Sequence, residues 1–261
     1  MSQFARINQL VEAGGRVVSI TLLTAPAVHA AAIGELLLLL PDGTVEGCLI
    51  DDKFTALVAA TAGGAAWDGP VALEIDYGGP CRLFCDSWTR EAGAVIFGGG
   101  HISVALAEML SLVGFAVAVV DDRPEFANKA RFPKAQAVIC KDFRAAIAGG
   151  DVAIDSQTAV VIVTRGHRHD LDCLRGTLGS DAKYLGMIGS RRRVAGILSL
   201  LAEEGVDPEA LGRLHAPIGL DIGAATPAEI AVSIVAEIIA VFRGGSLKPL
   251  KLRHGEVGRH E

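Results

Sequence analysis

The chain has 261 residues, of which 51% are hydrophobic and 21% charged, and its formal net charge is −6. That length suits one large or two modest domains with a sizeable core. Phosphate-backbone binding relies on clustered Lys and Arg, so the acidic balance excludes a general nucleic-acid binder. The five cysteines are Cys48, Cys81, Cys85, Cys140 and Cys173. Their odd number, and no secretory signal before the fold, favour a reducing cytoplasm.

The first block, residues 1–89, is predicted to be a small α+β domain. Its expected elements are helices at 4–11 and 52–60 and strands at 17–23, 33–40, 47–50 and 71–75. Residues 22–40 are almost wholly apolar and as long as a membrane span, but Pro26, His29 and Glu35 interrupt them, which favours strands. Glycines and a proline at 78–80, with the residues up to Glu91, predict a linker.

One cysteine of the first block lies outside the predicted linker. Cys48 follows Gly47 directly, just after a turn. A thiolate there could ligate a soft metal such as molybdenum or act as a nucleophile, and a buried structural cysteine is the alternative. Cys81 and Cys85 have no other Cys or His nearby and are predicted to be core or linker residues.

Strands and helices alternate through residues 90–245, which predicts a Rossmann-like domain with a mostly parallel sheet, so the fold class is α/β. The expected strands are 94–97, 115–120, 137–140, 159–164, 184–188 and 214–216, and the expected helices are 102–112, 143–148, 171–178, 191–204 and 227–242. The last helix is apolar on every side and should be buried against the sheet or a partner chain. Residues 246–261 are expected to be a polar, frayed tail.

A glycine-rich turn follows the first strand of this second block. Gly98 would make the tight turn, and Gly100, followed by His101, would let the backbone approach a pyrophosphate at the helix N-terminus. Asp121 lies about 20 residues further on, where an acid on the ribose hydroxyls is expected, and Arg123 could recruit a 2′-phosphate instead. The alternative is a glycine-rich turn that binds no ligand.

A polar segment follows the strand expected at 159–164, at the edge where open α/β sheets bind ligands. It contains Thr164, Arg165, Gly166, His167, Arg168, His169 and Asp170. Such a group can coordinate a metal, transfer protons or hold an anion, although two histidines are too few for a closed zinc site. The alternative is a solvated loop without a ligand, which would have a similar amino-acid composition.

A second segment of this kind follows the strand expected at 184–188. It contains Gly189, Ser190, Arg191, Arg192 and Arg193. Ser190 can cap the next helix, and arginine forks match phosphate or carboxylate. Positive residues in a first helical turn oppose the helix dipole, so a bound anion would relieve a local cost. A capped helix with solvated arginines is the alternative.

These motifs resemble those of the XdhC/CoxI-type accessory factors of xanthine dehydrogenase and related molybdenum hydroxylases. The likeness rests on Phe97-Gly98-Gly99-Gly100-His101, on residues 119–127, on Thr164-Arg165-Gly166-His167 with Asp170, and on residues 184–193, 217–224 and 226–234. Together these motifs cover residues 93–245. The family's N-terminal domain carries a Ser-Ser-Pro-Arg-type segment and a glycine-rich turn before a cysteine, whereas here residues 22–29 lack those serines.

The resemblance implies a cytoplasmic, dimeric protein that binds molybdenum cofactor and delivers its sulfurated form to a hydroxylase. The implied partners are an apo xanthine dehydrogenase-type enzyme, a cysteine desulfurase and a second copy of the chain. The pterin phosphate is expected among Arg191, Arg192 and the segment around His167, with Cys48 near the metal. A non-catalytic maturation chaperone is therefore expected rather than an enzyme.

Two other functions remain open from the residues alone. An NAD(P)-dependent oxidoreductase would use Gly98, Gly100 and Asp121, with His167, His169 or Asp170 as catalytic candidates. A nucleotide-sensing interaction module would use the Rossmann-like domain for regulation and the first block for a partner. Across these readings the expected cofactor contacts are Gly98, Gly99, Gly100, His101, Asp121, Arg123, Arg165, His167, Gly189, Ser190, Arg191 and Arg192, and the expected metal ligand is Cys48.

Overall fold

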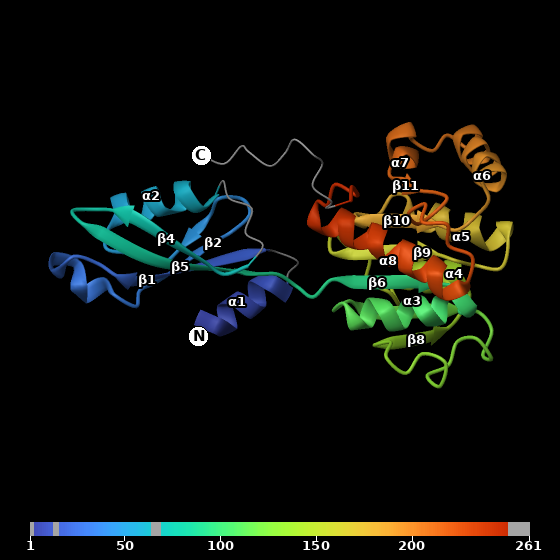
Figure 1. Ribbon diagram of the computed structural model, residues 1–261, viewed down its shortest axis with the longest axis horizontal. Helices are drawn as coiled ribbons and strands as arrows, with labels where there is room; N and C mark the ends of the chain where they lie inside the picture. Colours follow the sequence, from blue (N-terminus) through green and yellow to red (C-terminus); the bar gives the residue numbers. More distant parts are fainter. Residues whose placement is uncertain (1–2, 13–15, 64–68, 250–261) are drawn as a thin grey trace. The chain divides into compact units, whose positions relative to one another are not determined.

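The chain divides into two compact units, residues 1–90 and 91–261 (Figure 1). A computed structural model of the protein describes residues 3–12, 16–63 and 69–249, so most of the predicted tail lies outside the described residues. Within these ranges, none of the helices has the combined length and hydrophobicity of a membrane-spanning segment. The apolar stretch 22–40 instead forms the end of one strand, a 3-10 helix and a second strand.

The first unit is a five-stranded antiparallel sheet with the strand order β3-β2-β1-β5-β4. Its elements are α1 (Gln3–Glu12), β1 (Val17–Thr24), the 3-10 helix η1 (Ala27–Ala32), β2 (Leu36–Leu39), β3 (Val45–Glu46), α2 (Asp52–Gly63), β4 (Val71–Asp76) and β5 (Pro80–Trp88). Alternating residues of β1 point to opposite faces, so Ile20 packs in the α2 cluster with Phe54, whereas Val17 packs with Ile7 of α1.

The predicted linker is wrong, because residues 80–88 form β5, a strand paired with both β1 and β4. Cys81 and Cys85 are buried on its inner face, as a period-two pattern requires. Gly78 and Gly79, with φ of 70° and 136°, form the turn between β4 and β5. The strand predicted at 47–50 is also wrong, since β3 ends at Glu46 and turns follow.

The second unit is a six-stranded sheet in which every neighbouring pair is parallel, with the order β11-β10-β9-β6-β7-β8. The strands are β6 (Gly93–Phe97), β7 (Ala116–Asp121), β8 (Ala137–Cys140), β9 (Thr158–Ile162), β10 (Tyr184–Met187) and β11 (Leu214–His215). The helices are α3 (His101–Leu112), α4 (Phe143–Ala148), α5 (His167–Thr177), α6 (Arg191–Glu203), α7 (Pro208–Gly212) and α8 (Pro227–Arg243). This is the doubly wound Rossmann order, with its switch point between β6 and β9.

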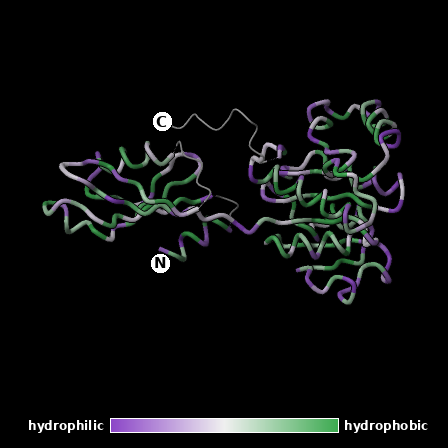
Figure 2. The backbone as a smooth tube through the Cα atoms, in the orientation of Figure 1, coloured by the Kyte–Doolittle hydropathy of each residue, from purple (hydrophilic) through white to green (hydrophobic). Residues whose placement is uncertain are grey.

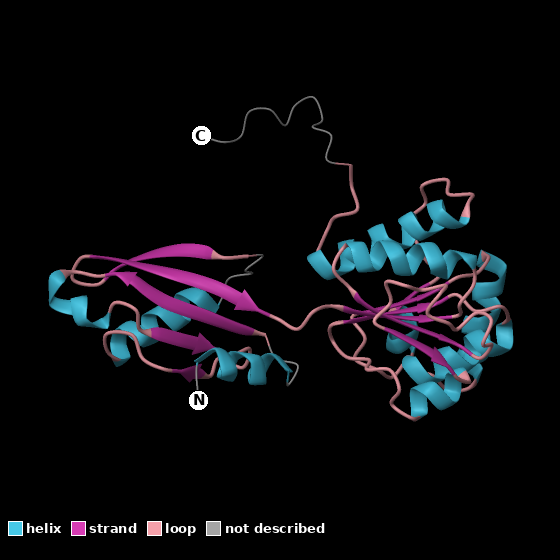
Figure 3. Ribbon diagram, turned by 90° about the horizontal axis from the view of Figure 1, so that it is seen from below, coloured by secondary structure: helices cyan, strands magenta, loops and turns pink. Residues whose placement is uncertain are grey.

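Helices cover both faces of the parallel sheet (Figure 3). On one face α3 and α8 pack over residues such as Ile96 and Val161, and on the other α4, α5 and α6 pack over Phe97 and Ile162. The strands accordingly form a hydrophobic layer inside the unit (Figure 2). The predicted burial of the last helix is confirmed for one face of α8, where Ala231, Ile234, Val235 and Ile238 are buried. Val232 and Ile239 on the same helix are exposed.

Candidate functional site

Three loops lie at the carboxyl edge of neighbouring strands in the second unit. Residues 98–100 follow β6, residues 163–166 follow β9 and residues 188–190 follow β10. Because these parallel strands are adjacent in the sheet, their carboxyl ends meet at one edge. Each loop leads into the N-terminus of a helix, respectively α3, α5 and α6, where free N–H groups favour an anion.

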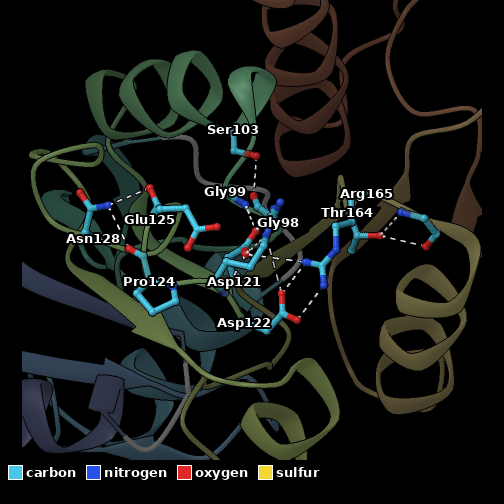
Figure 4. Close-up of polar contacts among 12 residues, drawn as sticks. Gly98, Gly99, Ser103, Asp121, Asp122, Pro124, Glu125, Asn128, Thr164 and Arg165 are labelled. Carbon is cyan, nitrogen blue, oxygen red and sulfur yellow. Dashed lines mark hydrogen bonds and ion pairs between the residues drawn. The ribbon is translucent and has the colours of Figure 1, made fainter.

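The three glycines of the first loop differ in how much space a side chain would have. Gly98 has φ of 108°, and a Cβ there would lie 2.5 Å from the Val163 carbonyl oxygen. A Cβ on Gly99 would lie 2.6 Å from the Phe126 carbonyl oxygen, whereas one on Gly100 would have no atom within 4 Å. Packing therefore requires the first two glycines, and only Gly100 borders open space. The buried Ser103 hydroxyl closes the turn by donating to the Gly98 carbonyl at 2.5 Å (Figure 4).

Asp121 lies at the predicted place, but its carboxylate is fully engaged within the protein. It is 0% exposed and accepts hydrogen bonds from the Gly99 backbone N–H at 2.7 Å and the Arg123 backbone N–H at 3.1 Å. The Arg123 Nε and Nη2 atoms also donate to it, each at 2.9 Å. Burial acts to raise the pKa of Asp121, but these hydrogen bonds outweigh it and lower the pKa. In this structure Asp121 braces the glycine turn.

An ion pair spans the end of β6 at the switch point. Arg165, which follows β9, donates from Nη1 and Nη2 to the two carboxylate oxygens of Asp122 at 2.5 and 2.8 Å (Figure 4). Asp122 follows β7, so the pair connects the two strands on either side of β6. The hydrogen bonds from Arg165 lower the pKa of Asp122 to about 2. Arg165 is a predicted cofactor contact, and its pairing with Asp122 is not visible in the sequence.

We expect the Arg165–Asp122 pair to stabilise the second unit in a pH-dependent way. Because the folded-state pKa of Asp122 lies below its ordinary value, the contribution is present above about pH 4 and is lost as the pH falls toward 2. Its size should be about 0.5–1 kcal/mol, because both side chains are partly exposed. The measurement is the difference in free energy of unfolding between the wild type and Asp122→Asn from about pH 7 to about pH 2.5. A difference that does not shrink in acid would contradict the assignment.

A buried carboxylate joins the loop after β9 to the start of α6. Asp170 is 0% exposed, accepts a hydrogen bond from the Thr164 hydroxyl at 2.5 Å and forms an ion pair with the Arg193 Nη2 atom. Burial raises the pKa of Asp170. The Arg193 Nε atom is buried and, among the described residues, has no hydrogen-bond partner. Asp170 therefore holds the Arg193 guanidinium in place.

The helix after β9 begins four residues earlier than predicted, at His167 rather than residue 171. His167, His169 and Asp170 consequently belong to the first turn of α5 and not to a loop. Its N-cap is Gly166, which offers no capping side chain, so the first N–H groups of α5 are available to a ligand. His169 packs edge-on against Phe143, with ring centroids 5.4 Å apart, whereas His167 is exposed.

A cavity of about 540 Å³ lies between α5 and α6. Its lining residues are His167, Leu171, Ser190, Arg192, Arg193, Gly196, Ile197 and Leu200. Ser190 is the predicted N-cap, accepting from the Arg193 backbone N–H at 3.2 Å. We call this cavity the α5–α6 groove; its polar lining comes from the two helix N-termini, and apolar side chains follow further along each helix.

The groove brings together some predicted site residues and leaves others out. His167, Ser190 and Arg192 line it, whereas Arg191 is exposed and Gly189 precedes the N-cap without lining it. His101 is exposed at the start of α3, and Arg123 is held by Asp121. Sequence reasoning missed Gly196, although an isolated glycine inside a helical pattern is a recognised signal of a special role.

Cys48 is exposed, so the alternative of a buried structural cysteine is wrong. It lies between β3 and α2, and the Thr55 hydroxyl is 3.5 Å from its sulfur. Gly47 beside it has φ of 104°, and a Cβ there would lie 2.6 Å from the Leu36 carbonyl oxygen. The Glu35 carboxylate holds the other side of the loop by accepting from the Ile50 N–H at 2.9 Å. The thiol is thus presented on a braced loop.

The described residues contain no group of three or more His, Cys, Asp or Glu side chains that could hold a metal ion. Cys48 therefore has no set of protein ligands around it in that part of the chain. A metal bound there would have to bring most of its ligands with it.

Comparison with known proteins gives consistent matches. A model of the XdhC Rossmann domain matches residues 94–238. The chain is 35% identical over 204 residues to the uncharacterised protein YqeB of Escherichia coli, covering 76% of this chain and 37% of that protein. It is 34% identical over 145 residues to a probable xanthine dehydrogenase subunit of Bacillus subtilis, covering 56% of this chain and 41% of that protein.

Among solved structures, a xanthine dehydrogenase from Bacillus halodurans superposes with a TM-score of 0.68 at 25% identity, covering 92% of this chain and 66% of that one. The chain spans less than half the length of the two sequence relatives. The matched family domain coincides with the parallel-sheet unit that carries the glycine turn, the Asp170–Arg193 pair and the α5–α6 groove. The chain therefore belongs to the XdhC family, and its second unit is the XdhC Rossmann domain.

Proposed function

We propose that this protein is an accessory factor that binds molybdenum cofactor and assists its sulfuration and insertion into a xanthine dehydrogenase-type enzyme. The observation that carries the proposal is the α5–α6 groove, where cationic side chains meet two helix N-termini. Membership of the XdhC family and the likeness to proteins named for xanthine dehydrogenase support the choice of cofactor and partner.

The groove fits the terminal phosphate of the pterin. Arg192 and Arg193 offer charged N–H donors, and the N-terminal N–H groups of α5 add a favourable dipole. In the described part of the chain, no hydrogen bond or ion pair engages the Arg192 side chain, so its donors are available. An anion there would offset the cost of placing arginines at the start of α6.

The exposed Cys48 thiol fits the metal end of the cofactor. Thiolates are soft ligands that suit a heavy transition metal, and a cofactor whose metal arrives bound to the pterin needs few further protein ligands. The braced loop around Gly47 and Glu35 keeps the sulfur accessible. Cys48 would contribute one ligand to the metal.

The chain's own part in such a reaction is to bind, orient and release. When bound, the cofactor supplies the molybdenum centre that the client enzyme uses. Arg192 and Arg193 would hold its phosphate, with Asp170 fixing the Arg193 guanidinium. We propose a cysteine desulfurase as the sulfur donor, and a second copy of the chain as a further partner.

Replacing Cys48 by serine is expected to lower molybdenum retention severalfold while leaving the fold intact. The hydroxyl is a harder and less acidic ligand than the thiol, and the site is exposed, so the substitution removes metal affinity without disturbing packing. The measurement is the molybdenum content of both proteins at matched thermal stability. Cys140→Ser is the matched control, because that cysteine is also exposed. Equal metal content in Cys48→Ser and the wild type would argue against the role of Cys48.

Activation of a client enzyme tests the function directly. Wild-type protein purified with its cofactor should activate a cofactor-free xanthine dehydrogenase-type enzyme in the presence of a sulfur donor. Protein carrying Arg192→Gln should activate it less at equal protein concentration. Activation by free cofactor alone, at the same rate and extent, would remove the need for an accessory factor.

Adenine-nucleotide binding remains a second candidate, because the strand order and the glycine turn are those of a dinucleotide-binding domain. The open space beside Gly100 and the uncapped start of α3 favour it. Calorimetry with NAD(P), flavin and adenine nucleotides tests it. Measurable heat with turnover of reduced nicotinamide would support an oxidoreductase, and heat without turnover would support a nucleotide-sensing module.

A further inference from the structure

The residues that line the α5–α6 groove change from polar to apolar along its length. His167 and Leu171 are one turn apart on α5, so a polar position is followed by an apolar one. On α6, Arg192 and Arg193 are followed one turn later by Gly196 and Ile197, and then by Leu200. A ligand that fills the groove would therefore meet positive charge at one end and apolar surface at the other.

Gly196 provides an independent sign that the apolar end is kept open. Glycine in a helix interior is destabilising relative to alanine, and it is normally retained where close packing excludes a side chain. Here a Cβ would have no atom within 4 Å, so the packing of this chain does not require glycine. The residue instead leaves space in the wall of the groove.

The switch point of the same sheet offers less to an anionic ligand. The Asp121 carboxylate and the Arg123 guanidinium are bonded to each other, and Arg165 is bonded to Asp122. Their charges cancel in pairs. At the groove, only Arg193 has a carboxylate partner in the described residues, and the exposed Arg192 adds an unbalanced positive charge.

We propose that the α5–α6 groove is a phosphate-ester site, in which Arg193 is a cation fixed by Asp170, Arg192 closes on the phosphate, and the organic part lies against Leu171, Ile197 and Leu200. This rests on the proposed function, since the pterin phosphate is one such ester, and it adds that recognition includes the organic part. Thr164 and Asp170 are positioning residues, because they act through Arg193 and line no part of the groove.

The test compares inorganic phosphate with phenyl phosphate, using calorimetry on the full chain. Phenyl phosphate should bind about tenfold more tightly, the effect of burying roughly 55 Å² of ring surface. Arg192→Gln should weaken both ligands by about tenfold or more, because a charged hydrogen bond is lost. Arg191→Gln is the matched control, with the same charge change outside the groove, and should change either affinity by less than about twofold at about 0.15 M salt.

A second pair of variants tests the apolar end. Gly196→Leu should remove the advantage of phenyl phosphate over inorganic phosphate while keeping the thermal stability at or above that of the wild type. Ala195→Leu adds the same side chain at an exposed neighbouring position outside the groove and should leave both affinities unchanged. Equal effects of Arg191→Gln and Arg192→Gln would overturn the proposal, as would a phenyl phosphate advantage that survives in Gly196→Leu.

These outcomes are separate from those of the cofactor proposal. If the phenyl phosphate pattern holds but purified protein contains no pterin, the groove proposal stands and the cofactor assignment falls. If pterin is bound and Gly196→Leu binds it as well as the wild type does, the groove proposal falls alone.

Discussion

Replacing Gly98 by alanine is expected to destabilise the second unit by about 3–5 kcal/mol. The residue has φ of 108°, and an added Cβ would lie 2.5 Å from the Val163 carbonyl oxygen and 2.9 Å from its carbonyl carbon. Both contacts are with backbone, which cannot rotate away. The measurement is urea unfolding of the full chain, with the transition of residues 91–249 identified by hydrogen exchange.

Gly100→Ala is the matched control, since it makes the same chemical change two residues later. Gly100 has φ of −71°, and a Cβ there would meet nothing within 4 Å. We expect its free energy of unfolding to fall by less than about 1 kcal/mol, the range for a changed N-cap residue. Equal destabilisation by the two substitutions would show that the turn is not packed against the Val163 carbonyl in this way.

Removing the Asp170 carboxylate is expected to cost about 2–4 kcal/mol. Asp170→Ala leaves the Thr164 hydroxyl without its 2.5 Å acceptor and the Arg193 guanidinium without its counter-charge. Arg193 is partly exposed, with 24% of its side chain accessible, so water should reduce the loss below that of a fully buried pair. Chemical denaturation at neutral pH measures the change.

A double variant separates the ion pair from the general effect of a cavity. Asp170→Ala combined with Arg193→Met removes both charges and should regain part of the stability lost by the single variant. If the double variant loses as much unfolding free energy as the two single variants together, Asp170 and Arg193 are not energetically coupled. Ligand affinity should fall in both cases, because each removes or releases the fixed guanidinium.

The fold of the second unit can be predicted where hydrophobic runs and turn residues agree. The predicted strand ending at Phe97, the glycine turn and the helix to Leu112 lie within one or two residues of β6 and α3. The start of α5 cannot be found in this way, because Gly166 provides no N-cap signal and the first turn is polar. In the first unit, Pro80 and the flanking glycines suggest a linker, although burial alternates from Cys81 to Cys85.

The candidate site shows a different limit of sequence reasoning. Spacing correctly identifies Asp121 as the acidic residue at the end of β7. Spacing cannot show which hydrogen-bond donors its carboxylate already accepts from. Four hydrogen bonds from Gly99 and Arg123 occupy it here. The same holds for the arginines that begin α6: neighbours in sequence lie about 100° apart around a helix, so only the structure shows which of them line the groove.

The most direct test of the central proposal is the molybdenum and pterin content of the full chain, purified without oxygen from a molybdate-fed host. We predict that both are present in the wild type, and that both fall severalfold in Arg192→Gln while Arg191→Gln resembles the wild type. Folded wild-type protein that carries neither molybdenum nor pterin under these conditions would contradict the assignment of this chain as a molybdenum cofactor carrier.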